Sequence, residues 1–198
     1  MQNLNYVNQL TQTVKAMKFL PENIYHVYNQ GNNQENIFIK DFQFLYFLQL
    51  YKDYVVPHCE TLAWCLMHNH FHFMIYTDDR CLEVKKQGGL ILDPITNGFR
   101  KLLSTYAHEF NIKNNRSGAL FRPKTKSICL NDEAGLNTQY LSKQDYYFNT
   151  FTYIHHNPVE AGIVKNTAAW KWSSFRFYNG LRANSICNKE LAKQICGF

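Results

Sequence analysis

Long apolar runs are absent from this sequence of 198 residues. No stretch comes near the roughly 18 consecutive apolar residues that a membrane-spanning helix requires. The first residues also lack a charged region followed by an apolar block, so we expect no signal peptide. These absences predict a cytoplasmic protein that has no membrane as a partner.

Cysteine pairs are also missing, since no two of the six cysteines form a Cys-x-x-Cys motif. Their scatter is typical of reduced thiols, and it argues against a zinc knuckle or a disulfide framework, while one structural disulfide stays open. Internal repeats and low-complexity tracts are absent as well. The chain is 45% apolar and 16% aromatic, which excludes a disordered protein and allows a buried core.

Acidic residues are nearly missing between residues 100 and 126. Seven lysines and arginines stand there beside one acid, Glu109, so the segment carries a charge of 7 − 1 = +6. The other 14 basic and 14 acidic residues of the chain sum to zero. A basic segment in an otherwise balanced protein indicates either a surface for a polyanion or a solvated face.

Hydrophobic periodicity predicts an alternation of strands and helices. Strands are expected at 24–30, 62–67 and 70–76, the last two joined by a tight turn at His68-Asn69. Helices are expected at 41–54, at 98–113 and at 146–156. Asp41 is expected to cap the first helix, and Asn157-Pro158 to end the third, because proline disfavours helix in the residue before it.

The remaining segments are expected to be less regular. Residues 78–98 predict a loop, residues 118–130 an extended segment, and the C-terminal end a weak helix. The order fits an α+β fold with helices packed on an antiparallel sheet. No linker divides the chain, so we expect one domain over 1–198, with a core at about 24–178 and a C-terminal extension at about 179–198.

Two histidines, His70 and His72, lie at positions i and i+2 of an expected strand. Side chains alternate along a strand, so both imidazoles share one face, with Cα atoms about 6.6 Å apart. Phe71 and Phe73 then point to the other face and into the core. The pair can hold one metal ion, or it consists of two ordinary histidines on a half-exposed strand.

A second candidate group is Tyr153 with Asn157. These residues are i and i+4 on an expected helix and therefore lie on one face. The amide oxygen of Asn157 could complete a metal site, with the Tyr153 phenol close to the same ion. Alternatively, Tyr153 is a core aromatic and Asn157 only ends the helix.

Together, the two groups fit the cleavage of a phosphodiester. A metal ion can polarise the phosphate, and a tyrosine can attack it to form a covalent phosphotyrosine. A free phenol has a pKa of about 10 and needs a nearby cation or base to ionise at neutral pH. Histidine and amide ligands leave the charge of the metal largely uncompensated, which favours a phosphate substrate.

These motifs resemble a known family. CLMHNHFHFMI (65–75) is similar to the HUH motif region of single-tyrosine HUH transposases, and YIHHNPVEAGIV (153–164) resembles the second signature of the REP-associated tyrosine transposases in that group. Further similarity covers YHVYNQGNN, YAHEFNIKNNRSGALFRPKTKS and WKWSSF. The resemblance extends over roughly residues 24 to 178, and the order of the motifs makes it specific.

The resemblance implies a ferredoxin-like sheet that carries the histidine pair on a central strand. It makes Tyr153 the nucleophile, His70 and His72 metal ligands, and Asn157 the third ligand of a Mg²⁺ or Mn²⁺ ion. Its substrate is single-stranded DNA with a hairpin, cleaved to a 5′-phosphotyrosine and a free 3′-hydroxyl, by a monomer or a homodimer. The candidate DNA contacts are Arg100, Lys101, Arg116, Arg122, Lys124 and Lys126.

Several alternatives stay open. Tyr106, beside the basic segment, is a competing nucleophile, although its apolar neighbours favour packing. Phe121 could stack on an unpaired base or belong to the core, and Trp170 and Trp172 are expected to pack the C-terminal segment. The chain could also be a metal-dependent hydrolase, or a nucleic-acid-binding protein that has lost its chemistry.

Overall fold

A four-stranded antiparallel sheet forms the centre of the molecule. The computed structural model describes residues 19–83, 85–87, 90–132 and 142–198. The sheet has the order β2-β3-β1-β6, and each neighbouring pair is antiparallel. Its strands are β1 (Ile24–Gln30), β2 (Glu60–Met67), β3 (His70–Tyr76) and β6 (Lys126–Cys129).

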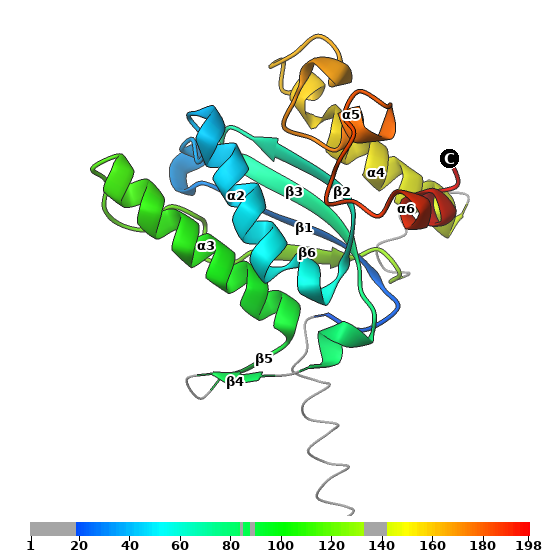
Figure 1. Ribbon diagram of the computed structural model, residues 1–198, viewed down its shortest axis with the longest axis horizontal. Helices are drawn as coiled ribbons and strands as arrows, with labels where there is room; N and C mark the ends of the chain where they lie inside the picture. Colours follow the sequence, from blue (N-terminus) through cyan, green and yellow to red (C-terminus); the bar gives the residue numbers. More distant parts are fainter. Residues whose placement is uncertain (1–18, 84, 88–89, 133–141) are drawn as a thin grey trace, which may run out of the picture.

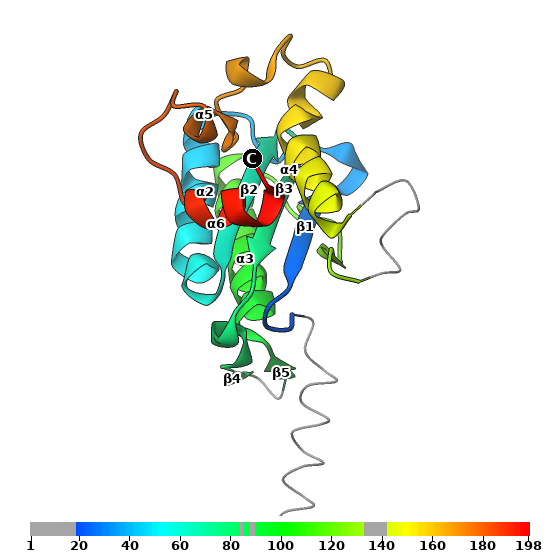
Figure 2. The ribbon, with the colours of Figure 1, turned by 90° about the vertical axis from the view of Figure 1, so that its right-hand side faces the viewer.

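Helices cover both faces of this sheet. Helices α2 (Asp41–Tyr54) and α3 (Pro94–Lys113) pack on one face, and α4 (Lys143–Glu160) lies on the other, over β2 and β3 (Figures 1 and 2). The succession β1-α2-β2-β3-α3-β6 with this strand order is the ferredoxin-like topology. The predicted α+β fold is confirmed, and so are the two strands joined at His68-Asn69.

The predicted boundary of helix α4 was wrong. The helix begins at Lys143, after the N-cap residue Ser142, whose hydroxyl accepts from the Asp145 amide, and it continues through Pro158 to Glu160. Proline removes the backbone donor that would bond the Ile154 carbonyl oxygen, yet the helical conformation continues past it. The Ala161 amide still bonds the carbonyl oxygen of Asn157. Asn157 is therefore held inside the last helical turn and does not end the helix.

The predicted loop at 78–98 was also wrong. It contains a 3-10 turn (Asp79–Leu82), the short strands β4 (Lys85–Gln87) and β5 (Leu90–Leu92), and the first turn of α3. Helix α3 starts earlier than expected because Asp93 caps it: the Asp93 Oδ1 accepts a hydrogen bond from the Thr96 amide at 2.7 Å. Pro94, the next residue, suits the first helical position.

Two smaller expectations are corrected as well. Asp41 is the first helical residue of α2 and does not cap it; the Gln43 side chain accepts from the amides of Ile39 and Lys40 instead. Within the expected extended segment at 118–130, only β6 is a strand, and Phe121 adds one isolated bridge to Gly31. The C-terminal helix is α6 (Lys189–Cys196), which packs against α4 and β2.

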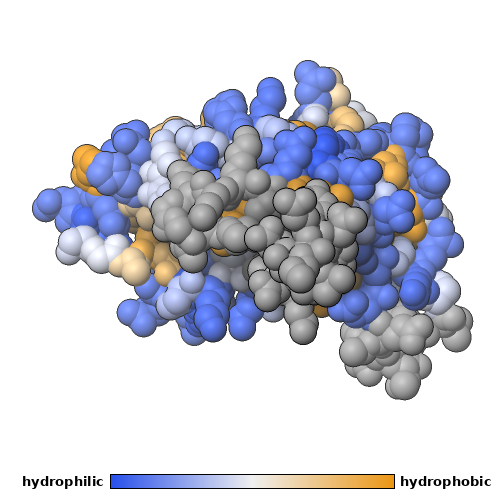
Figure 3. Space-filling model, turned by 90° about the horizontal axis from the view of Figure 1, so that it is seen from below, coloured by the Kyte–Doolittle hydropathy of each residue, from blue (hydrophilic) through white to orange (hydrophobic). Residues whose placement is uncertain are grey.

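The surface seen in Figure 3 is largely hydrophilic, and hydrophobic residues reach it in small patches. Among the described residues, no helix combines the length and the apolar character needed to cross a bilayer. All six cysteines are free thiols in the structure.

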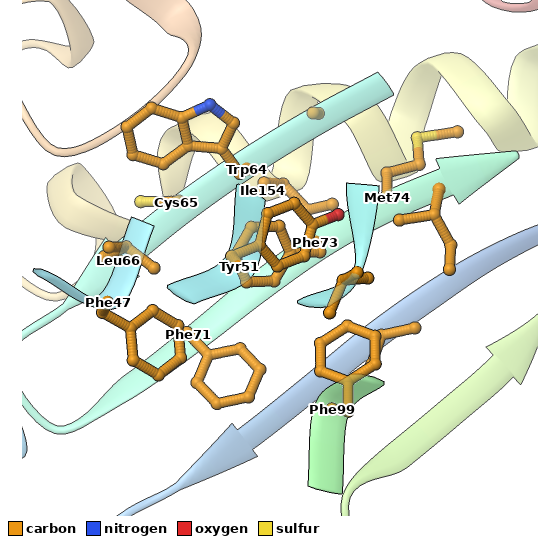
Figure 4. Packing of buried hydrophobic residues seen from close by; sticks show 14 of the residues in the cluster. Phe47, Tyr51, Trp64, Cys65, Leu66, Phe71, Phe73, Met74, Phe99 and Ile154 are labelled. Atoms are coloured by element: carbon orange, nitrogen blue, oxygen red, sulfur yellow. The ribbon is translucent and has the colours of Figure 1, made fainter. Parts of the chain in front are cut away.

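Aromatic side chains fill the core between the sheet and helices α2 and α3 (Figure 4). Tyr51 of α2 stacks on Phe73 of β3 with ring centroids 3.9 Å apart and planes within 4°. Phe47 packs on Phe71 in the same layer. Because Phe71 and Phe73 are anchored on this face, the alternate residues of β3 are fixed on the face toward α4.

Gly98 sets the approach of α3 to α2. A Cβ atom at this position would lie 2.2 Å from the carbonyl oxygen of Tyr54. Overpacking typically costs about 1–3 kcal/mol, and the better helix propensity of alanine offsets about 1 kcal/mol of this. We therefore expect Gly98→Ala to lower the free energy of unfolding by up to about 2 kcal/mol. Urea denaturation measures this effect. Ser104→Ala, exposed on the same helix, is the control, and an equal effect of both variants would contradict the packing argument.

The outer edge of β2 is covered by the segment Trp172–Ser174. The Leu66 amide donates to the Trp172 carbonyl oxygen at 2.8 Å, and the Ser174 amide donates to the Trp64 carbonyl oxygen at 2.9 Å. Both Trp170 and Trp172 are buried, as predicted for packing residues. This pairing protects an edge strand that would otherwise present open hydrogen-bonding groups.

Candidate active site

Strand β3 presents His70 and His72 on the face toward α4. Their rings lie 5.0 Å apart at 90°. His72 is only 5% exposed, and His70 is half-buried. Burial lowers the pKa of both imidazoles, and for His72 the neighbouring histidines add to the effect. Both rings are therefore neutral at neutral pH, which is the state that binds a metal.

His26 is a member of this group that the sequence did not reveal. It lies on β1, is buried, and its Nε2 is 2.9 Å from Nδ1 of His72. Burial lowers the pKa of His26 to about 4. The available signal was the alternation of His26 and Tyr28 along β1, but using it required the register that places β1 beside β3.

The second ring nitrogen of His72 is an orphan. Nε2 is buried and has no hydrogen-bond partner. Buried polar atoms are almost always paired, so this one calls for a ligand. A ring nitrogen that binds a metal carries no proton. For Nε2 to act as a ligand, Nδ1 of His72 must carry the proton and donate it to His26.

Helix α4 brings Tyr153 and Asn157 to the same place. The Tyr153 ring is 5.8 Å from that of His72 and 6.0 Å from that of His26, and the residue is 42% exposed. Its phenol is therefore accessible to a macromolecule, which a core aromatic would not be. The structure thus places the two sequence motifs side by side.

Asn157 faces His70. Its Nδ2 donates to the Tyr153 carbonyl oxygen at 2.9 Å, one turn back along α4. The Asn157 side chain makes a hydrogen-bonding contact with His70 that raises the pKa of this histidine, whereas burial lowers it. A side-chain oxygen that accepts a hydrogen bond from the charged ring has this effect. The amide is buried and is held in a helix, so its position relative to the histidine pair is fixed.

The residues fit a divalent metal ion. Within the described parts of the chain, no three His, Cys, Asp or Glu side chains form a metal-binding group. The candidate donors are therefore the orphaned Nε2 of His72, a ring nitrogen of His70, and the amide oxygen of Asn157. Two neutral imidazoles and an amide bring no negative charge to the ion.

Tyr106 is a core residue. It is 1% exposed, and its hydroxyl donates to the Ile37 carbonyl oxygen at 2.5 Å. Burial raises the pKa of its phenol above the usual value. Phe121 is buried as well, with its ring 6.0 Å from that of Tyr106 and 6.3 Å from that of Phe71. Both residues therefore pack, and of the two candidate nucleophiles only Tyr153 is accessible.

The other histidines near the motifs differ in environment. His155 is buried, and its Nε2 is 2.7 Å from the Ser174 hydroxyl, so it joins α4 to the segment that covers β2. His156 is exposed on α4, with Nδ1 3.2 Å from the Thr152 carbonyl oxygen. His68 lies in the turn before β3, its Nδ1 3.2 Å from the Phe38 carbonyl oxygen.

The cations of the basic segment form two groups: the first is bound within the protein, and the second is exposed. Arg116 is engaged within the protein, its guanidinium donating to both carboxylate oxygens of Glu35 at 2.7 and 2.6 Å. Lys126 belongs to the second group: it pairs with Tyr28, which pairs with His72, so all three side chains face α4. The other exposed cations are Arg100, Lys101, Lys113, Arg122 and Lys124, of which Lys113 pairs with Glu109.

The fold and the site define an α+β protein of ferredoxin-like topology, with a histidine pair under an exposed tyrosine. A solved structure with a similar fold is that of a REP-associated tyrosine transposase bound to a REP hairpin. The TM-score is 0.56 at 17% sequence identity, over 85% of this chain and 86% of that chain. At this identity the likeness shows a shared fold. A scan against protein-family models and a search of curated proteins found no match.

Proposed function

We propose that this protein is a transposase-type DNA strand transferase, which cleaves and rejoins single-stranded DNA carrying a hairpin through a covalent bond to Tyr153. The observation that carries the proposal is the exposed Tyr153 ring beside His72, whose buried Nε2 has no partner. The shared fold with a transposase bound to a DNA hairpin supports it.

The reaction balances without an external energy source. The phenolic oxygen of Tyr153 attacks the phosphorus atom, and the bond between phosphorus and the 3′-oxygen breaks. The phenol loses its proton to solvent, and the departing oxygen takes one up as a 3′-hydroxyl. Attack of a 3′-hydroxyl on the phosphotyrosine then reverses these steps, so each broken phosphodiester is replaced by another phosphate ester.

A Mg²⁺ or Mn²⁺ ion held by His70, His72 and Asn157 would polarise the phosphate. The chain itself supplies orientation. Strand β3 is paired on both sides within the sheet, and α4 holds the phenol beside the imidazoles. With the proton of His72 on Nδ1, His26 Nε2 would accept the hydrogen bond, which would keep the Nε2 lone pair of His72 free.

A denaturing gel tests the proposal. The protein is incubated with Mn²⁺ and hairpin-bearing single-stranded oligonucleotides that are labelled at the 3′ end, because the proposed adduct retains that end. The expected result is a labelled band at the mass of the protein plus DNA. Cleaved DNA without this band would show a hydrolase, and salt-sensitive binding without cleavage would show a binding protein.

Lys126 is expected to contribute to the electrostatic part of DNA binding. Each phosphate contact that is lost flattens the slope of log K against log salt by about 0.7–0.9. Lys126→Gln should therefore flatten the slope by about this amount in fluorescence anisotropy titrations. The control is Lys52→Gln, exposed on α2 and away from the α4 face. A slope that is unchanged by Lys126→Gln would place the DNA elsewhere.

A further inference from the structure

Tyr28 on β1 is a second tyrosine at the candidate active site. Its ring lies 5.0 Å from that of His26 and 5.7 Å from that of His72, and its plane is within 29° of the His72 plane. Because Tyr28 pairs with His72 across β1 and β3, both side chains leave the sheet on the same face. None of the functional roles assigned above uses Tyr28.

The hydroxyl of Tyr28 is available to a ligand. Tyr28 is half-buried, and its hydroxyl makes no hydrogen bond with another described residue. In the described parts of the chain, the one buried side-chain nitrogen or oxygen without a partner is Nε2 of His72, so the Tyr28 hydroxyl reaches solvent. The core residues Tyr51 and Tyr106, in contrast, use their hydroxyls for hydrogen bonds within the protein.

The reacting phosphate would lie within reach of this hydroxyl. The rings of Tyr28 and Tyr153 contact the same two histidines, Tyr28 at low angles and Tyr153 edge-on at 79° and 81°. One strand spacing, about 4.8 Å, separates the backbone of Tyr28 from that of His72. A phosphodiester has two non-bridging oxygens. With one of them toward His72, the other can face Tyr28 while Tyr153 attacks the phosphorus atom.

Lys126 extends this row of side chains. It pairs with Tyr28 across β1 and β6, so its side chain leaves the same face of the sheet. Lys126 is exposed and forms no ion pair with a described residue. The non-bridging oxygens of a phosphodiester only accept hydrogen bonds, whereas a phenol and an ammonium group donate them. The row therefore matches a phosphate in both charge and hydrogen bonding.

We propose that Tyr28 is a further catalytic residue, whose hydroxyl donates a hydrogen bond to a non-bridging oxygen of the phosphate that Tyr153 attacks. This inference rests on the proposed function. A donor that is already in place before the reaction stabilises the negative charge on the phosphate oxygens as the new bond forms. Tyr28 keeps its proton throughout, so the balance of the reaction does not change.

Removal of the hydroxyl tests this role. Tyr28→Phe keeps the ring against His26 and His72 and should lower the single-turnover cleavage rate roughly 10²- to 10³-fold, as does loss of an oxyanion-hole donor. Its Mn²⁺ affinity, measured by calorimetry without DNA, should equal that of the wild type. Tyr46→Phe is the matched control, because Tyr46 is a half-buried tyrosine of α2 on the other face of the sheet. An unchanged cleavage rate in Tyr28→Phe would overturn the inference.

Sulfur substitution identifies the oxygen that Tyr28 contacts. The two probes are hairpin oligonucleotides with one sulfur in place of either non-bridging oxygen at the cleaved linkage. In the wild type, one of the two should react about tenfold more slowly, the effect of weakening a hydrogen bond to a charged group. In Tyr28→Phe, this difference between the probes should nearly vanish. Equal differences in both proteins would show that Tyr28 does not contact the phosphate.

Binding without metal gives a measure that does not depend on turnover. In EDTA, Tyr153→Phe should bind the native hairpin several-fold more tightly than a hairpin with an uncharged methylphosphonate at the same linkage, as expected for loss of one charged hydrogen bond. Addition of Tyr28→Phe should reduce this difference. A difference that stays the same would again contradict the contact.

The outcomes separate the two proposals. An adduct that forms at an equal rate in wild type and Tyr28→Phe would refute the role of Tyr28 and leave strand transfer standing. No adduct in the wild type, together with a methylphosphonate effect that depends on Tyr28, would refute transfer and support Tyr28 as a phosphate contact.

Discussion

Tyr153→Phe is expected to abolish the covalent protein–DNA adduct, with a fall of roughly 10⁴-fold or more in cleavage rate, as for removal of other nucleophiles. Only the phenolic oxygen is lost, and the ring keeps its contacts with His26 and His72. Hairpin binding should therefore stay close to that of the wild type. With one labelled oligonucleotide, single-turnover kinetics measure the cleavage rate, the denaturing gel measures the adduct, and fluorescence anisotropy measures hairpin binding.

The matched control is Tyr106→Phe. It removes a buried hydroxyl that donates to the Ile37 carbonyl oxygen, so it should lower the free energy of unfolding by about 1 kcal/mol and leave the adduct in place. A Tyr153→Phe variant that still forms the adduct would refute Tyr153 as the nucleophile. A variant that loses both hairpin binding and stability would make it a structural residue.

His72→Ala is expected to reduce Mn²⁺ affinity by more than about 100-fold, because it removes a ligand where second-shell changes alone cost about 10- to 100-fold. Cleavage should fall in parallel. Calorimetric titration of Mn²⁺ into protein without DNA reads the affinity independently of activity. His108→Ala, exposed on α3, is the control and should leave both quantities unchanged.

Replacement of His26 should also weaken Mn²⁺ binding, but by less than replacement of His72. His26→Leu removes the acceptor for the Nδ1 proton of His72 and should weaken Mn²⁺ binding by about 10- to 100-fold. His26→Gln restores an acceptor and should recover part of the affinity. Long-range ¹⁵N spectra of the metal-free protein report the tautomer directly. If His72 keeps its Nδ1 proton in His26→Leu, His26 does not determine that state.

Periodicity predicted the sheet well, because polar and apolar residues alternate over the first four positions of β3. Phe71 and Phe73 must enter the core, and this alone places His70 and His72 on the opposite face. The errors arose where local signals compete. Gly98 resembled a loop residue, yet α3 needs it for close approach to Tyr54. Pro158 predicted a helix end, yet the helix continues through it to Glu160.

The candidate site was only partly visible from the sequence. Tyr153 and Asn157 could be placed on one helix face from their spacing. His26 could not be connected with His72, since the two lie 46 positions apart and meet only through strand order and register. The ion pair of Arg116 with Glu35 likewise joins distant residues. Composition therefore counted Arg116 among the DNA contacts, whereas tertiary structure gives its charge a partner inside the protein.

The pairing of Trp172–Ser174 along β2 has a consequence for assembly. A second copy cannot extend the sheet at this edge unless it displaces the protein's own hydrogen bonds. Ser174 also contacts His155 of α4, so the same segment fastens the helix that carries Tyr153 onto the sheet of its own chain. The candidate nucleophile Tyr153 and the candidate ligands His70, His72 and Asn157 therefore lie together within one chain.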